Sequence, residues 1–254
     1  MTHDQNGAMT QDLFREDAYL KECTATVTGV GEHGITLDRT VFYPLGGGQA
    51  GDAGILVLGN GSELAIADTR KGKDAEGRPT AQIVHVPAPG QEALLAQLKP
   101  GDSVTARVDW ERRHKLMRFH TTTHVLCHLV PQLVNGCSIT PDYARLDFNM
   151  TDPLDKEALT RGIAGLVAAA LPVAVGSITD EELDANPALV KSMSVQPPRG
   201  TGRIRTIRIG TEQQIDFQPC GGTHVANTAE IGKVVVTRIE KKSATTRRVV
   251  LGFA

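Results

Sequence analysis

Two short motifs in the second half of the chain carry residue types that bind transition metals. HTTTH places His120 and His124 four residues apart, and QPCGGTH places Cys220 four residues before His224. Residues four apart lie on one face of a helix, so both imidazoles of the first motif can reach one ion. Two glycines let the second motif turn tightly and aim its thiolate and imidazole together. Three imidazoles and a thiolate suit tetrahedral zinc, and we predict one Zn²⁺ per chain on these four residues.

Two familiar classes of zinc enzyme do not fit these motifs. A zincin protease requires HExxH, but Thr121 follows His120. A nucleobase deaminase requires HxE and PCxxC. Pro219 does precede Cys220, but no histidine has a glutamate two places later and no second cysteine follows. His128 lies four residues after His124, on the same face of the predicted helix, and we expect it to pack beneath the site.

The elements that must position these residues form an α+β pattern. Residues 110–130 contain neither glycine nor proline and repeat apolar or histidine side chains every three or four positions, which predicts a helix that ends at Pro131. A second helix is predicted near 154–170, with Asp152 and Pro153 at its start. The β-rich runs predict one mainly antiparallel sheet with the helices on one face: 138–148, 173–178, 203–209, 214–217, 233–240 and 247–253.

The first half of the chain is typical of a small β domain. Turn-forming residues separate six β-rich runs, at 22–30, 34–37, 54–58, 64–68, 81–86 and 103–109. Six strands in about a hundred residues predict a small barrel or sandwich, and we expect a barrel-like domain over 1–109 followed by the α+β domain over 110–254. The glycine-rich segment FYPLGGGQAGDAG, Phe42 to Gly54, is predicted to be a loop.

Composition and charge exclude several classes of protein. The chain has 254 residues, 40% of them hydrophobic, which is typical of a globular protein. The longest apolar stretch, 162–175, is too short to span a membrane, so we expect no membrane partner. The N-terminus lacks a leader pattern, and the four cysteines form no CxxC pair. We therefore expect a cytoplasmic protein. Cys127 and Cys137 are expected to be ordinary buried residues. Residues 1–109 carry a net charge of −6 and 110–254 a net charge of +4.

The motifs together resemble those of a known family. HTTTHVL, QPCGGTHV and the glycine-rich FYPLGGGQAGDAG resemble the three signatures of alanyl-tRNA editing proteins of the AlaX type, which are freestanding relatives of the editing domain of alanyl-tRNA synthetase. The resemblance continues through 145–148, through 229–232, and through Ser243 with Arg247 and Arg248. The glycine-rich barrel half implies the medium-length form. The family implies hydrolysis, in trans, of the ester that joins serine to tRNA(Ala), with glycine as a second candidate.

Such a reaction has a physical justification. A synthetase pocket built for alanine cannot exclude the smaller glycine by size, and it rejects an analogue with one extra hydroxyl by a factor of only about a hundred. An editing site should instead hydrogen-bond the serine hydroxyl. The resemblance places Thr123 and Gln49 at editing positions of the family, and Thr140 and Ser138 are further pocket candidates. Thr122 departs from the alanine of the family motif and adds a hydroxyl that we expect near the metal.

Basic residues are candidates for contact with the tRNA. One interpretation of the basic C-terminal run is a solvated surface, and the other is a docking face for acceptor-stem phosphates. The predicted phosphate contacts, which would position the tRNA without reading its sequence, are Arg112, Arg113, Arg118, Lys241, Lys242, Arg247 and Arg248. The expected partner is tRNA(Ala) charged with serine or glycine, and no obligatory protein partner is inferred.

The mechanism and two rival functions stay open at this level. Zinc either activates the attacking water or orients the substrate, and no aspartate among Asp142, Asp147 and Asp216 stands out as a general base. The rival functions are a deacylase for another aminoacyl-tRNA, such as the threonyl-synthetase editing type, and a non-catalytic zinc-stabilised RNA-binding module.

Overall fold

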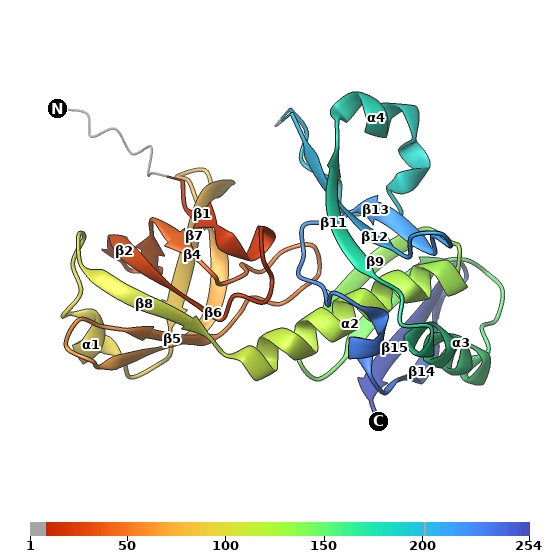
Figure 1. Ribbon diagram of the computed structural model, residues 1–254, viewed down its shortest axis with the longest axis horizontal. Helices are drawn as coiled ribbons and strands as arrows, with labels where there is room; N and C mark the ends of the chain where they lie inside the picture. Colours follow the sequence, from red (N-terminus) through yellow and green to blue (C-terminus); the bar gives the residue numbers. More distant parts are fainter. Residues whose placement is uncertain (1–8, 201) are drawn as a thin grey trace. The chain divides into compact units, whose positions relative to one another are not determined.

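The computed structural model (Figure 1) describes residues 9–200 and 202–254 and confirms the α+β class. Its contacts divide the chain into two compact units. Among the described residues the first unit holds 9–46 and 50–113, and the second holds 47–49 and 114–254. Three residues of the glycine-rich loop, Gly47, Gly48 and Gln49, thus belong to the second unit. No helix among the described residues is long and apolar enough to cross a membrane.

The first unit is built on a closed barrel of antiparallel strands. The six β-rich runs of the sequence are its strands. Around the barrel the order is β2 (Glu22–Gly31), β3 (Gly34–Leu37), β7 (Pro79–Pro87), β6 (Glu63–Lys73), β5 (Gly54–Val57) and β8 (Ser103–Val108). Buried side chains alternate with more exposed ones most clearly along β2, β6 and β8. Val27, Leu64 and Val104 are among the residues that fill its core. The unit also contains β1 (Gln11–Asp12), η1 (Leu13–Arg15), β4 (Arg39–Thr40) and α1 (Glu92–Leu95).

A buried histidine makes the first unit sensitive to acid. The His85 ring lies between the Thr40 hydroxyl, 2.8 Å from Nε2, and the Ile35 carbonyl oxygen, 3.1 Å from Nδ1. Burial lowers the pKa of His85 to about 4, because the charged ring would lose its hydration. The unfolded chain takes up this proton near its ordinary pKa of 6.5, so His85 contributes stability that is present above pH 6.5 and is lost as the pH falls towards 4.

We therefore expect His85 to account for about 3 kcal/mol of the free energy of unfolding that is lost between pH 6.5 and pH 4. Urea unfolding across this range should give a steeper pH dependence for the wild type than for His85→Gln. Equal slopes for the two proteins would show that His85 is not responsible for acid sensitivity.

The second unit places a long helix against two antiparallel sheets. Helix α2 (Trp110–Leu129) ends before Pro131, as predicted, and the Phe119 ring stacks on Phe253 with 4.1 Å between centroids. The four-stranded sheet has the order β14 (Val234–Ser243), β15 (Thr246–Phe253), β10 (Ala144–Asn149) and β9 (Val134–Ile139). The three-stranded sheet has the order β11 (Val173–Ile178), β12 (Ile204–Ile209) and β13 (Asp216–Pro219). The helical elements besides α2 are α3 (Lys156–Ala168), α4 (Asp180–Ala185), η2 (Pro187–Leu189) and η3 (Thr228–Ile231).

Three predictions about these elements were wrong in detail. The expected single sheet is two sheets, because β11, β12 and β13 pair only with one another among the described strands. The run 138–148 is not one strand, since a turn after Thr140 separates β9 from β10. Helix α3 begins at Lys156 rather than near 154, and its N-cap is Asp155, whose carboxylate accepts from two backbone N–H groups.

Candidate metal centre

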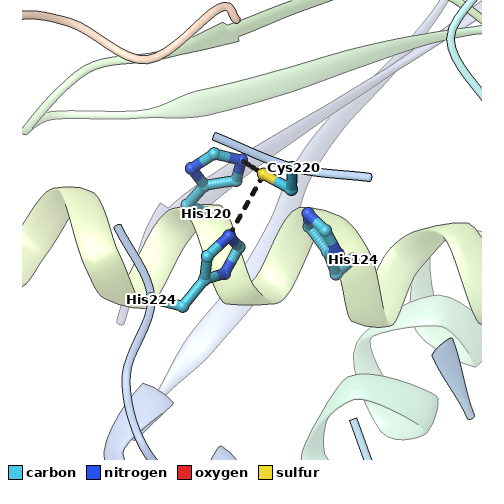
Figure 2. Close-up of side chains that lie close together, drawn as sticks. All are labelled: His120, His124, Cys220 and His224. Carbon is cyan, nitrogen blue, oxygen red and sulfur yellow. Dashed lines mark hydrogen bonds between the residues drawn. The ribbon is translucent and has the colours of Figure 1, made fainter. Parts of the chain in front are cut away.

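Four side chains from two distant segments converge in the second unit. His120 and His124 come from α2, and Cys220 and His224 come from the turn that follows β13. One ligand atom from each lies within 4.8 Å of the other three (Figure 2). The Cys220 sulfur is 3.4 Å from Nε2 of His120 and 3.3 Å from Nε2 of His224. The four predicted ligands thus form a cluster that could bind a metal, and a set of three imidazoles and one thiolate fits zinc.

Each imidazole is held through its Nδ1 atom, which turns Nε2 towards the cluster. Nδ1 of His120 lies 2.7 Å from the Gln49 amide oxygen, and Nδ1 of His124 lies 2.7 Å from the Asp216 carboxylate. Nδ1 of His224 lies 3.2 Å from the Thr121 hydroxyl. An acceptor at Nδ1 fixes that proton, so Nε2 is the nitrogen of each ring that faces the cluster and can bind a metal.

The Gln49 side chain is bound into this framework through both ends of its amide group. Its amide oxygen also accepts from the Thr223 backbone N–H at 3.1 Å, and its amide nitrogen donates to the Thr223 hydroxyl at 2.8 Å. Gln49 is fully buried and holds His120, which favours a positioning role for this residue beside its predicted contact with the serine side chain. Gly222 is required beside it, because a Cβ there would lie 2.1 Å from Cε1 of His120.

Replacing Gln49 by leucine should therefore weaken metal binding about ten- to a hundredfold, the usual effect of losing an outer partner of a ligand. Competition with a chelator measures that affinity. The ratio of hydrolysis rates on seryl and alanyl esters should not change in the metal-saturated variant. A changed ratio with unchanged metal affinity would return Gln49 to a substrate-binding role.

The three threonines of HTTTH have separate tasks. The Thr121 hydroxyl accepts from the Val225 backbone N–H at 3.2 Å as well as contacting His224, and sequence reasoning missed this role. The Thr122 hydroxyl donates to the Arg118 carbonyl at 2.7 Å, so it bonds the preceding helical turn and not the metal centre where we expected it. The Thr123 hydroxyl donates to the His120 carbonyl at 2.7 Å.

The cysteine turn is braced by an arginine that the motifs do not reveal. Arg205, on β12, donates from Nη1 to the carbonyls of Cys220 and Gly222, at 2.7 and 3.0 Å. The Cys220 backbone N–H donates back to the Arg205 carbonyl at 3.1 Å. These contacts hold the backbone of the turn that carries Cys220. Sequence alone gives no signal for them, because Arg205 lies on a different strand.

The electrostatics of the cluster favour a thiolate. Burial opposes ionisation of Cys220, but the charge and the hydrogen bond of His120 outweigh it and hold the pKa of Cys220 well below the usual value. Burial holds the pKa of His224 well below its usual value. Burial also opposes the charge on His124, but hydrogen bonds to Asp216 and Cys220 raise its pKa to about 9. Asp216 is buried, yet His124 and Lys191 lower its pKa to about 2.

Other predicted site residues lie elsewhere. The Thr140 hydroxyl donates to the Tyr143 carbonyl at 2.9 Å and accepts from the Asp142 and Tyr143 N–H groups, so it stabilises the turn between β9 and β10. Ser138 lies on β9 opposite Arg145. The expectation that His128 packs beneath the site was wrong, because its side chain is exposed. Cys127 is buried as expected and Cys137 is half-buried.

Two of the predicted tRNA contacts are excluded by burial. Arg113 is fully buried in an ion pair with Asp52, and Arg247 is buried with its guanidinium on the carbonyls of Ser243, Thr246 and Thr151. Both guanidiniums satisfy the protein's own acceptors and cannot reach a phosphate.

The other predicted contacts differ in how they are held. Arg248 makes a two-point ion pair with Asp147, with distances of 2.7 and 2.8 Å. Arg118 donates to the Ile231 carbonyl and stacks on Phe253, and Arg112 donates to the Gly51 carbonyl. Lys241 and Lys242 are exposed on β14.

Comparison with known proteins assigns the chain first to a class and then to a family. Residues 204–250 match the family model of the threonyl and alanyl tRNA synthetase second additional domain, and residues 8–112 match that of class II (A) tRNA synthetases. The alanyl-tRNA editing protein AlaX-M of Saccharolobus solfataricus is 31% identical over 245 residues, which cover 95% of this chain and 98% of that protein. The chain belongs to the AlaX-M family of alanyl-tRNA editing proteins. It is an aminoacyl-tRNA deacylase, a hydrolase.

Alanine–tRNA ligases match over a smaller part of their length. Those of Saccharolobus islandicus and Hyperthermus butylicus are 30% and 35% identical to this chain. Each match covers 91% of this chain but only 25% and 24% of the ligase, so the chain spans about a quarter of these enzymes.

Proposed function

We propose that this chain hydrolyses the ester bond of serine mischarged on tRNA(Ala), with glycine as a second substrate, and that the activity depends on zinc. The observation that supports the proposal best is the cluster of His120, His124, Cys220 and His224 with a separate acceptor at each Nδ1. We further propose that 1–109 form a barrel domain, that 110–254 form the editing domain, and that the protein works in the cytoplasm.

In this proposal the four clustered side chains hold the zinc ion. When bound, zinc supplies a Lewis acid that can polarise an oxygen of the substrate or of the attacking water. Gln49, Asp216 and Thr121 keep the imidazoles in the tautomer that binds, and Arg205 holds the backbone of the turn that carries Cys220. The burial of the histidines excludes bulk water from the framework, which strengthens these electrostatic contacts.

Selection of serine over alanine is assigned to Thr123. Its hydroxyl proton is committed to the His120 carbonyl, so the oxygen can only accept a further hydrogen bond. A serine hydroxyl can donate to that oxygen, whereas the alanine methyl cannot. This difference spares the correct product, because alanine offers no donor to the remaining acceptor site of this buried oxygen.

Thr123→Val should therefore reduce the preference for seryl over alanyl ester about tenfold or more, because it keeps the shape of the side chain and removes the acceptor. Zinc content should stay at the wild-type level. Deacylation of both esters by the wild type and the variant measures the effect. A preference that survives the substitution would place the serine contact on another residue.

Contact with the tRNA is assigned to the predicted basic side chains that are not buried. Lys241 and Lys242 extend from β14 into solvent, and Arg248, Arg118 and Arg112 are half-buried. Such cations would position the acceptor stem through phosphates without reading sequence. Binding should accordingly weaken with added salt.

The experiment that tests the proposed function is the release of labelled serine from Ser-tRNA(Ala) by the zinc-loaded protein, with and without a chelator. We expect rapid release that the chelator abolishes. Release only from seryl ester on a different tRNA would favour the threonyl type of editing that the matched family model also covers. No release from any aminoacyl-tRNA would contradict the proposal.

A further inference from the structure

A buried carboxylate lies directly behind one of the four clustered histidines. Asp216, the first residue of β13, is 2% exposed. Its Oδ2 accepts from Nδ1 of His124 at 2.7 Å and from the Gln218 amide nitrogen at 2.9 Å. Its Oδ1 accepts from the Lys191 ammonium at 2.6 Å. Both carboxylate oxygens are thus occupied, one by a metal-ligand candidate and the other by a cation.

Lys191 is itself held in place by the main chain. It lies in the segment between η2 and β12, and its carbonyl accepts from the Val134 N–H at 2.8 Å. The Met193 N–H donates to the Val134 carbonyl at 2.9 Å, and Ser192 forms a parallel bridge with Val134. These bonds fasten the backbone around Lys191 to the start of β9, so the ammonium approaches Asp216 from a fixed anchor.

The partner of His124 differs in kind from those of the other two histidines. His120 is held by the neutral amide of Gln49, and His224 is held by the neutral hydroxyl of Thr121. Because Asp216 is charged, its hydrogen bond to His124 is stronger than one between neutral groups. The buried negative charge also requires a nearby cation. Lys191 supplies that cation from outside both metal motifs.

We propose that Asp216 and Lys191 are a pair of positioning residues that fixes His124 as a metal ligand and thereby controls how tightly the protein retains its metal. Asp216 holds the His124 ring with Nε2 towards the other ligands. Lys191 holds the second oxygen of Asp216, so the carboxylate cannot rotate away from the ring. The inference rests on the metal centre of the proposed function, but it concerns metal retention and needs no tRNA.

The pair is tested first by Asp216→Asn. A carboxylate accepts from His124 and Lys191 on separate oxygens, whereas an asparagine has one acceptor oxygen and presents N–H groups on the other side. We expect zinc affinity, measured by competition with a chelator, to fall about ten- to a hundredfold. With Co²⁺ at saturation, the visible absorption bands should shift, because the His124 ring is no longer held in one orientation.

Lys191→Met is the second variant that tests the pair. We expect a smaller loss of zinc affinity than for Asp216→Asn, and no further loss when Lys191→Met is added to Asp216→Asn, since lysine acts through the carboxylate. The matched control is Asp147→Asn, which removes a carboxylate that pairs with Arg145 and Arg248 in the same unit. The control should bind zinc as tightly as the wild type.

The outcomes separate this inference from the proposed function. Wild-type affinity and an unchanged Co²⁺ spectrum in Asp216→Asn would overturn the inference, and so would additive losses in the double variant. If the wild type itself fails to retain zinc, the zinc dependence of the proposed function fails first. Circular dichroism identifies any variant that does not fold, and Lys191→Met then serves as the test, because its lysine is partly exposed and its removal leaves Asp216 in place.

Discussion

Replacing Cys220 by alanine is expected to abolish metal retention and ester hydrolysis together. Cys220 supplies the one thiolate of the cluster, and neighbouring groups hold its pKa well below the usual value. Loss of an outer partner costs a metal site about ten- to a hundredfold, so loss of a direct ligand should weaken zinc binding by more than about a hundredfold. Metal content after dialysis and serine release from Ser-tRNA(Ala) measure the two effects.

The matched control for this prediction is Cys137→Ala. Cys137 lies on β9 in the same unit, is also a free cysteine, and does not belong to the cluster. It should keep its zinc. Full activity of Cys220→Ala without bound metal would contradict the zinc-dependent mechanism, and retained zinc with lost activity would show that Cys220 contacts the substrate instead.

The largest expected loss of stability comes from Arg113→Ala. Arg113 and Asp52 are both buried, and the carboxylate also accepts from the Tyr43 N–H at 2.6 Å. The guanidinium pairs with Asp52 and donates to the carbonyls of Ala18 and Val41. Removing it leaves a buried carboxylate without a cation, which should lower the free energy of unfolding by about 3–5 kcal/mol. Urea denaturation at pH 7 measures the change.

Arg112→Ala is the natural comparison. Arg112 is the neighbouring residue, but within the described part of the chain its half-buried guanidinium donates only to the Gly51 carbonyl, so its loss should cost about 1 kcal/mol. Changing Asp52 to Asn together with Arg113→Met should recover part of the loss, because the uncompensated charge is gone. A loss below about 1 kcal/mol for Arg113→Ala would show that the pair contributes little to folding.

The cluster of candidate ligands was predictable from sequence because each pair lies within one short motif. Four residues of helix bring His120 and His124 to one face, and two glycines bring Cys220 and His224 together. The spacing of residues within each motif was therefore enough to predict which side chains would lie together. The strand runs of the first half were also predictable, since alternation and turn residues are local signals.

The framework around the ligands was not predictable, because it depends on contacts between distant segments. Gln49 reaches His120 from 71 positions away, and Asp216 reaches His124 from 92. Sequence could only rank Asp216 among three carboxylates without a clear role. The position of Asp216 four residues before Cys220, on a short strand that leads into the cysteine turn, is the signal that could have found it.

Charge in the sequence misled for a related reason. Arg113 and Arg247 stand next to other basic residues, which suggested a phosphate-binding surface. Sequence shows neither Asp52 nor the carbonyl groups that receive their guanidiniums in the fold. The predicted candidates Lys241 and Lys242, on β14, are exposed to solvent.

The central claim is that the zinc-loaded chain removes serine from tRNA(Ala) and spares alanine. The most direct measurement is the rate of amino-acid release from labelled Ser-tRNA(Ala) and Ala-tRNA(Ala) in parallel, at equal enzyme and tRNA concentrations. The account predicts rapid, chelator-sensitive release of serine, with alanine released at least about tenfold more slowly. Equal rates on both esters, or no release of serine by folded protein that contains zinc, would contradict it.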